Sequence, residues 1–191
     1  MSESNLKREI HYFLLHEYEK EETYLREMHR NGWKLKSLTI PCFYTFEKCE
    51  PEDVVYRLDF KQVNNVAEEQ EYLQLYRDYG WEYFQKMNDY LYFRKKASED
   101  NNLEIFSDNE SRVEMVERIM KKRVFPITLL LLVSTLMMLS CISHYDMWHE
   151  TAFIVFFVIW LVFLIWDVYA VVKSAVGLNR LKEKYGSAER K

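Results

Sequence analysis

Apolar and polar residues alternate along short segments of the first hundred residues, and stretches with helical periodicity separate these segments. In VVYRLDFK, residues 54–61, every second side chain is apolar, and this period of two predicts a strand with one buried face. An amphipathic helix is predicted to follow at about Val66–Tyr79. The segments WEYFQKM (81–87) and YLYFRK (90–95) then predict a hairpin.

The same pattern occurs twice, with a shift of 48 residues. The segment EETYLREMHRNGW (Glu21–Trp33) aligns with EQEYLQLYRDYGW (Glu69–Trp81), and FYTFEK (Phe43–Lys48) aligns with the last hairpin strand. An extended, β-leaning segment precedes both copies, and in the first it is EIHYFLLHEY (Glu9–Tyr18). This internal repeat predicts an α+β fold made of β-α-β-β twice over. We expect an antiparallel sheet of about six strands with two helices on one face.

A Gly-Trp pair follows each predicted helix, at Gly32-Trp33 and at Gly80-Trp81. Glycine adopts the left-handed conformation that ends many helices, and the indole then begins the next strand. Both tryptophans are therefore expected to be structural.

The predicted sheet carries apolar side chains on both faces, because Tyr90 and Tyr92 point one way while Leu91 and Phe93 point the other. With both helices on one face, the helix-free face must be covered by something else. The alternatives are a second copy of the chain, the helix before the first apolar run, or a flat apolar ligand. Self-association or packing is favoured over the ligand.

A ligand-binding version of this fold is retained as the less favoured alternative. Duplicated β-α-β-β units occur in bacterial effector-binding domains that hold hydrophobic cations in an aromatic cleft beside an acidic residue, an analogy of fold alone. The candidate ligand-binding residues are Trp33, Trp81, Tyr90, Tyr92, Asp59 and Glu47. Arg57 is expected to neutralise Asp59.

Two long apolar runs follow this domain. Residues Phe125–Ser143 contain no charge, and Thr151–Val172 contain a single charged residue, Asp167. At about 1.5 Å per residue the first run is roughly 28 Å long, which matches the hydrocarbon core of a bilayer. Two buried core helices are the alternative, but uncharged runs of this length are rare in small soluble domains. We therefore predict a transmembrane hairpin.

Flanking charge predicts the orientation of the hairpin. Residues 112–123 carry five basic residues against two acidic ones, residues 173–191 carry six against two, and the connector 144–150 has no Lys or Arg. Because cytoplasmic flanks are basic, both termini are placed in the cytosol and the protein in the cell membrane, crossing it twice. The predicted parts are a cytosolic domain (1–97), a linker with a juxtamembrane helix (98–124), the hairpin (125–143 and 151–172) and a basic cytosolic tail (173–191).

Few residues suggest a chemical role. Asp167 lies near the cytosolic end of its span, where a helix–helix contact or an interfacial anchor is favoured over a proton relay or ligand site. The connector residues His144, Asp146, His149 and Glu150 are of metal-binding types, but a solvated turn is favoured. The three cysteines lack the spacing of a zinc site, so no metal is expected.

Charge and glycine placement exclude several function classes. Residues 1–100 carry 15 Lys or Arg against 20 Asp or Glu, and an acidic domain without a basic patch does not suit nucleic acid. The four glycines stand apart from one another, so no loop is suited to cradle a phosphate. No nucleophile lies in a recognisable catalytic setting. We expect neither an enzyme nor a bound cofactor.

Three segments carry a family resemblance: FYTFEKCEPEDVVYRLDF (Phe43–Phe60), EYLQLYRDYGWEYF (Glu71–Phe84) and IFSDNESRVEM (Ile105–Met115). Over roughly residues 8–120 the chain resembles the family called domain of unknown function 2812, from Gram-positive bacteria. The resemblance implies two membrane helices after the domain, as in many relatives, and it implies no catalytic residue. Because such proteins are often encoded beside PadR-type transcriptional repressors, it also implies a link to a membrane stress or drug response.

These patterns together predict a membrane-anchored regulatory or sensory protein. Its partners would be the lipid bilayer and a protein or small effector bound by the cytosolic domain, with self-association through the helix-free sheet face as another option. The basic tail would lie on the anionic inner leaflet. The alternative function is an accessory or scaffold subunit of a membrane complex such as an exporter.

Overall fold

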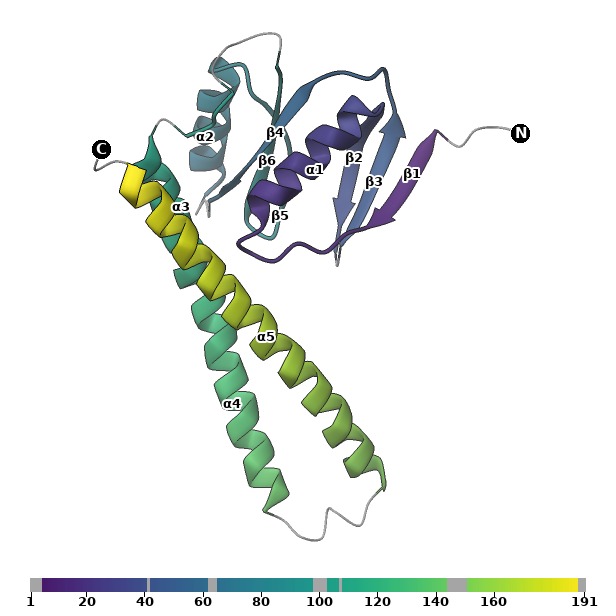
Figure 1. The fold of residues 1–191 in the computed structure, drawn as a ribbon, viewed down its shortest axis with the longest axis vertical. Coiled ribbons are helices and arrows are strands. Elements are labelled where there is room, and N and C mark those ends of the chain that lie inside the picture. The colour runs from purple at the N-terminus through teal and green to yellow at the C-terminus, as the bar shows by residue number, and fades with distance from the viewer. Residues whose placement is uncertain are drawn as a thin grey trace.

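The computed structural model describes residues 5–40, 42–61, 65–97, 103–106, 108–143 and 151–188. Strands and two helices form the first part of the chain, and long helices form the second (Figure 1). The first part comprises β1 (Leu6–Ile10), α1 (Tyr18–Arg30), β2 (Trp33–Thr39), β3 (Phe43–Lys48), β4 (Val54–Phe60), α2 (Val66–Asp78), β5 (Glu82–Met87) and β6 (Tyr90–Lys96). The second comprises α3 (Asn109–Ile119), the π-helical turn η1 (Met120–Val124), α4 (Phe125–Ile142) and α5 (Thr151–Ala188).

The strands form two antiparallel sheets with the same internal order, β1-β3-β2 and β4-β6-β5. This arrangement confirms the α+β class and the predicted β-α-β-β order in each half. The expectation of one sheet of about six strands is wrong. The side chain of Gln85 on β5 joins the two edges, accepting from the Leu38 N–H at 3.1 Å and donating to the Leu38 carbonyl at 2.7 Å.

Local irregularities recur at equivalent positions of the two halves. Gly32 and Gly80, 48 residues apart, both have a φ of +80°. The pairing register shifts between Leu35 and Ser37 on β2 and between Tyr83 and Gln85 on β5, again 48 residues apart. Each bulge bends its strand, and no ladder pairs the two edge strands β2 and β5 in the described residues.

The expected β-strand at residues 9–18 is displaced. Strand β1 ends at Ile10, and residues 11–17 form an irregular loop that leads into α1. The ring of His11 in this loop packs against Tyr24 of α1, with 4.4 Å between the ring centroids. The loop therefore places its aromatic side chains around the N-terminal end of α1 instead of extending the sheet.

The two helices of the first part cover opposite faces of the second sheet, so the expectation of two helices on one face is wrong. Helix α2 packs over Val55, Leu91, Phe93 and Trp81. The other face packs against α1 and α3 through a larger cluster that includes Tyr56, Leu58, Phe60, Tyr90 and Tyr92. Neither face of the second sheet is therefore open, whereas Leu6, Ile10 and Phe43 remain exposed on the first sheet.

Helix α1 also covers the outer edge of β4. The Leu58 N–H donates to Glu22 Oε1 at 2.8 Å, and Glu22 Oε2 lies 3.4 Å from Arg57. Burial raises the pKa of Glu22 to about 8, an effect that Arg57 opposes. A carboxylate on the helix thus satisfies a backbone donor that an unpaired edge strand would leave exposed.

The helices of the second part are long and apolar. One helix runs from Asn109 to Ile142 and the other is α5; both are long and apolar enough to cross a membrane. In their most apolar stretches only 6% and 0% of the residues are buried, unlike the core helices of a soluble domain. The N-cap of α3 is Asp108, whose Oδ1 accepts from the Ser111 N–H at 2.7 Å.

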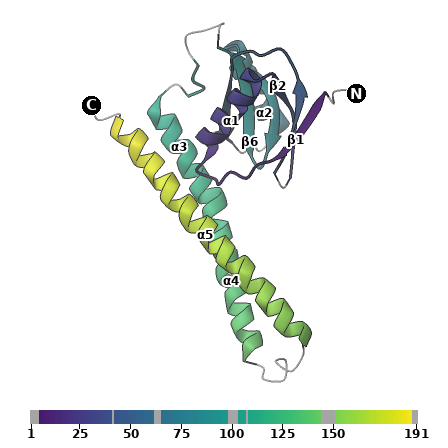
Figure 2. The ribbon, with the colours of Figure 1, turned by 45° about the vertical axis from the view of Figure 1, so that its right-hand side comes forward.

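Helix α5 continues well beyond Val172, where the apolar run ends, and lies beside α3 (Figure 1). Near its C-terminal end the Tyr185 hydroxyl lies 3.3 Å from the Tyr18 hydroxyl and also contacts Glu19. Lys182 forms an ion pair with Glu117 of α3 at 2.5 Å. Figure 2 shows the same end of α5 beside α3, next to the domain. The basic segment that follows Val172, predicted as a separate tail, is therefore part of a helix that packs on the domain.

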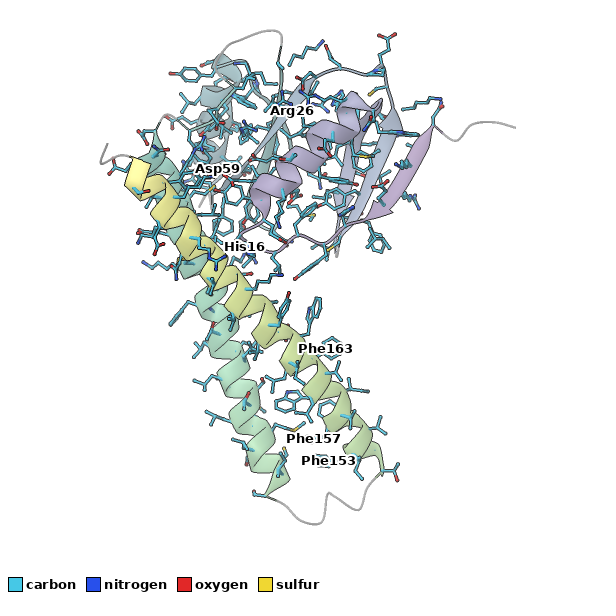
Figure 3. All side chains as sticks on the ribbon, viewed as in Figure 1. His16, Arg26, Asp59, Phe153, Phe157 and Phe163 are labelled. Carbon is cyan, nitrogen blue, oxygen red and sulfur yellow. The ribbon has the colours of Figure 1, made fainter. Side chains whose placement is uncertain are left out.

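The loop before α1 approaches α5 closely at His16 and Gly177. A Cβ added to Gly177 would lie 2.2 Å from Cγ and Cδ2 of His16. Figure 3 shows His16 beside α5. The hydrogen side chain of glycine is therefore required for this close contact.

Replacing Gly32 with alanine should lower the free energy of unfolding by about 1–2 kcal/mol, because φ is positive there. In addition, the new Cβ would lie 3.0 Å from the Cys49 carbonyl oxygen. Thermal unfolding of the purified full chain measures this change. Gly186→Ala is the control, since no atom lies within 4 Å of its added Cβ. Equal thermal unfolding midpoints for Gly32→Ala and the wild type would contradict the positive φ assigned to Gly32.

Replacing Gly177 with alanine should displace the loop that carries His16 from α5. Amide hydrogen exchange across residues 11–17 should then accelerate by at least about tenfold, because the contact that orders the loop is lost. Gly186→Ala should leave this exchange unchanged. Unchanged exchange in Gly177→Ala would show that the loop does not depend on the contact.

Candidate ligand pocket between the domain and the helices

A pocket with a volume of about 310 Å³ lies where the domain meets the long helices. Residues of the 11–15 loop, α1, β3, the β5–β6 turn and β6 form its domain side, and residues from η1, α4 and α5 form the opposite side. Its charged, polar and aromatic lining includes His11, Tyr12, Phe13, Tyr18, Glu21, Cys42, Tyr44, Asn88, Tyr90, Tyr92, Arg123, Asp167 and Ser174. A pocket of this volume suits a small molecule.

Glu21 is the carboxylate that the domain contributes to the pocket. It is 7% exposed, and its Oε1 accepts hydrogen bonds from the Tyr44 hydroxyl at 2.8 Å and the Tyr92 hydroxyl at 2.7 Å. Burial raises the pKa of both tyrosines, so their hydroxyls remain protonated donors. Both bonds end on one oxygen, and none of the described residues donates to Oε2.

The charge of Glu21 is not balanced by a neighbouring cation. Burial raises the pKa of Glu21, and the two tyrosine hydrogen bonds oppose that rise. Among the ion pairs of the described residues none includes Glu21. Arg123 lines the pocket but pairs with Asp89 at 2.9 Å. Burying a carboxylate without a partner is costly, so this position is suited to a positively charged ligand.

Aromatic rings surround this carboxylate. The rings of Phe13 and Tyr44 meet edge to face, with 6.2 Å between their centroids. The Tyr90 hydroxyl donates to the Leu15 carbonyl at 3.1 Å, which ties the loop to β6. Aromatic faces attract cations, and the attraction strengthens where water is excluded.

The pocket brings together three of the residues selected from the sequence: Tyr90, Tyr92 and Asp167. The two tyrosines reach it from β6, and Asp167 reaches it from α5. Because Asp167 lies on the opposite wall from Glu21, the pocket has one carboxylate from each of its two sides. The two tyrosines were selected for an aromatic sheet face and Asp167 as the single charge of a predicted span, and their proximity was not predicted.

Four other selected residues lie outside this pocket. Trp81 is 3% exposed in the cluster beneath α2, and Trp33 packs partly buried at the edge of the main core. Glu47 on β3 pairs with Lys34 at 3.1 Å and with Lys36 at 3.6 Å, and the hydrogen bond from Lys34 contributes most to lowering its pKa. Their positions indicate packing and surface roles.

Asp59, the fourth, lies on the α2 side of β4 (Figure 3) and is 1% exposed. It accepts a hydrogen bond from Tyr72 and pairs with Arg118 of α3 at 3.4 Å. Arg57, the expected partner, instead pairs with Glu22 and Glu104. Asp59 therefore connects the second sheet with α2 and α3.

Glu21 was not among the residues selected from the sequence. A signal was present, because Tyr18, Leu25 and Met28 form an apolar stripe at helical spacing and Glu21 occupies the same stripe. An acidic residue on a buried helix face is unusual. The partners of Glu21 come from distant strands, so its environment could not be read from α1 alone.

No group of three or more His, Cys, Asp or Glu side chains within the described ranges has an arrangement that could hold a metal ion. The connector residues His144, Asp146, His149 and Glu150 lie outside those ranges. The cysteines Cys42, Cys49 and Cys141 are free thiols.

Comparison with known proteins agrees with the family suggested by the sequence motifs. No protein of curated function and no solved structure matches the chain. The family described as "Protein of unknown function (DUF2812)" matches residues 17–129. This match spans more than half of the chain, from α1 through β2 to β6 and α3 to the start of α4, and it leaves out β1. The chain belongs to the DUF2812 family.

Proposed function

We propose that this protein is a membrane-anchored sensor whose cytosolic domain binds a small hydrophobic cation in the pocket around Glu21. The observation that supports this proposal is a buried carboxylate with two tyrosine donors, aromatic neighbours and no cationic partner among the described residues. A cation in the pocket would balance the charge of Glu21 and contact the surrounding rings. The proposed function consists of ligand binding and needs no chemical reaction.

Membrane anchoring is supported by the exposure of the long helices. Large apolar side chains of α4 and α5 are exposed, such as Leu130 at 68% and Phe163 at 63%. An exposed apolar surface of this extent needs a lipid environment or a protein partner. The basic flanks of both helices favour the arrangement in which the domain and both termini are cytosolic.

Signal transmission would use the shared walls of the pocket. A ligand there would contact β6 and α1 on one side and the Asp167 region of α5 on the other. Because the ligand affinity depends on the separation of the two walls, binding would favour one relative position of the domain and the helices. The PadR-type repressors implied by the sequence resemblance would be one class of downstream partner.

The proposed topology predicts that the protein stays in the membrane fraction after carbonate extraction. A reporter that is active only in the cytosol should be active at either terminus, because both helix flanks are basic. The same reporter inserted in the connector 144–150 should be inactive. Extraction into the soluble fraction, or inactive terminal reporters, would contradict the topology.

The proposed ligand class predicts that benzyltrimethylammonium binds the purified full chain more tightly than its neutral isostere neopentylbenzene. Glu21→Gln should weaken binding of the cation by at least about tenfold and remove the preference for the charged compound. Glu47→Gln, a change at a half-exposed, lysine-paired carboxylate outside the pocket, is the matched control. Isothermal titration calorimetry measures the binding of both compounds to the wild type, Glu21→Gln and Glu47→Gln.

Binding of the cation should also depend on pH. Burial raises the pKa of Glu21, so a larger fraction of this group is protonated at a given pH than for an ordinary carboxyl. A cation binds the ionised form, and its affinity should therefore rise as the pH passes upward through that raised pKa. Glu21→Gln should lack this dependence. Equal affinities of Glu21→Gln and the wild type at every pH would contradict the proposal.

A further inference from the structure

A second concave surface lies on the other side of the contact between His16 and Gly177. It is a groove of about 900 Å³ between the start of α1 and the middle of α5, open along one side. The apolar part of its lining comes from α5 and includes Ile165, Val168 and Val172. The basic part includes Lys20 from α1 and Lys173, Arg180 and Lys184 from α5.

The α5 lining of the groove is apolar at one end and carries the basic residues at the other. Ile165, Val168 and Val172 line the apolar end, and Lys173, Arg180 and Lys184 lie at the other end together with Val176 and Leu181. The change occurs at Lys173, the residue after the predicted span Thr151–Val172. In the proposed membrane arrangement, the apolar part lies at the depth of the acyl chains and the basic part at the depth of the headgroups.

The groove carries a net positive charge. Its lining contains four basic residues and two acidic ones, Glu17 and Glu19, which leaves a formal excess of two. Glu17 pairs with Lys20 at 2.6 Å, and Glu19 with Lys184 at 3.3 Å. Among the described residues, Lys173 donates only to the neutral hydroxyl of Tyr169, at 2.7 Å, and Arg180 has no acidic partner. The excess charge therefore resides at Lys173 and Arg180.

We propose that this groove binds one anionic phospholipid of the inner leaflet, with its phosphate at Lys173 and Arg180 and an acyl chain along Val172, Val168 and Ile165. The proposal rests on the membrane placement given above. Charge complementarity favours an anionic headgroup, and the apolar end of the groove favours a ligand with a hydrocarbon chain. In this arrangement the lipid contacts both α1 and α5, beside the contact that connects the domain to the helices.

The bound lipid would stabilise the contact between the domain and α5. Its headgroup would lie between Lys20 of α1 and Arg180 of α5, with the His16 ring next to it in the groove lining. A ligand that binds two elements in one arrangement favours that arrangement in proportion to its affinity. The attachment of the domain to the helices would then depend on the anionic lipid content of the membrane.

The test measures lipid binding to the delipidated full chain in a neutral detergent by native mass spectrometry. Phosphatidylglycerol should bind with a stoichiometry of one and at least about tenfold more tightly than phosphatidylcholine, because two basic side chains contact its charge. Lys173→Gln/Arg180→Gln should lose this preference. The charge-conserving variant Lys173→Arg/Arg180→Lys should keep it, which separates loss of charge from loss of fold.

The matched control is Lys121→Gln/Lys122→Gln, which removes the same charge from exposed positions in η1 outside the groove. It should retain the preference for phosphatidylglycerol. Equal loss in both glutamine variants would indicate diffuse attraction and overturn the proposal, as would equal binding of the two lipids by the wild type. Displacement of the lipid by millimolar inorganic phosphate would also overturn it, because the acyl chain would then contribute nothing.

The two proposals can fail independently. Lys173→Gln/Arg180→Gln leaves Glu21 and its tyrosine donors intact, so benzyltrimethylammonium should bind this variant as it binds the wild type. Cation binding without lipid selectivity overturns the lipid site alone. Lipid selectivity without cation binding overturns the sensor proposal and leaves the lipid site supported.

Discussion

The close contact between the loop before α1 and the middle of α5 determines how the two parts of the molecule are arranged. Glycine at position 177 lets the ring of His16 lie directly against the helix backbone. The Tyr18–Tyr185 and Glu117–Lys182 contacts fix the end of α5 to α1 and α3. The pocket around Glu21 and the basic groove lie on either side of this contact, and both have one wall from the domain and one from α5.

The buried carboxylates of the domain differ in their partners. This difference separates the structural carboxylates from Glu21, the one assigned to ligand binding. Asp59 is buried but pairs with Arg118, and Glu22 accepts from a strand backbone and faces Arg57. Glu21 has only two neutral hydroxyl donors. Buried ionised groups normally have a charged partner. The absence of one at Glu21, within the described residues, makes this carboxylate the best candidate for a functional group.

Periodicity and local signals were sufficient to predict the elements. The alternation in residues 54–61 identified β4, and the Gly-Trp pairs marked the ends of α1 and α2. Long apolar runs with almost no charged residue identified α4 and most of α5. The continuation of α5 was not predicted, because the drop in hydropathy at Lys173 was interpreted as the start of a separate tail. Leu178, Leu181 and Tyr185 have helical spacing in that segment and bury against the core cluster or α1, so a signal for the helix was present.

Features that depend on contacts between distant segments could not be predicted from the sequence. The strands form two sheets instead of one, and α1 covers the face of the second sheet that was expected to be open. Tyr92 was selected for an exposed aromatic face, whereas its hydroxyl donates to Glu21 inside the domain. Helical spacing shows which side of α1 is buried, but it does not show which strands, or which part of α5, lie against that side.

The central claim is that the domain packs on α5 through His16 and Gly177 in the membrane, and cross-linking tests it most directly. The Cβ of His16 lies 2.8 Å from the Cβ position of residue 177, close to the roughly 3.8 Å of a disulfide after a small adjustment. With the three native cysteines replaced by serine, His16→Cys/Gly177→Cys should form an intramolecular disulfide in native membranes under mild oxidation. The pair His16→Cys/Gly186→Cys should remain reduced. Failure of the first pair to cross-link, or equal cross-linking of both, would contradict the account.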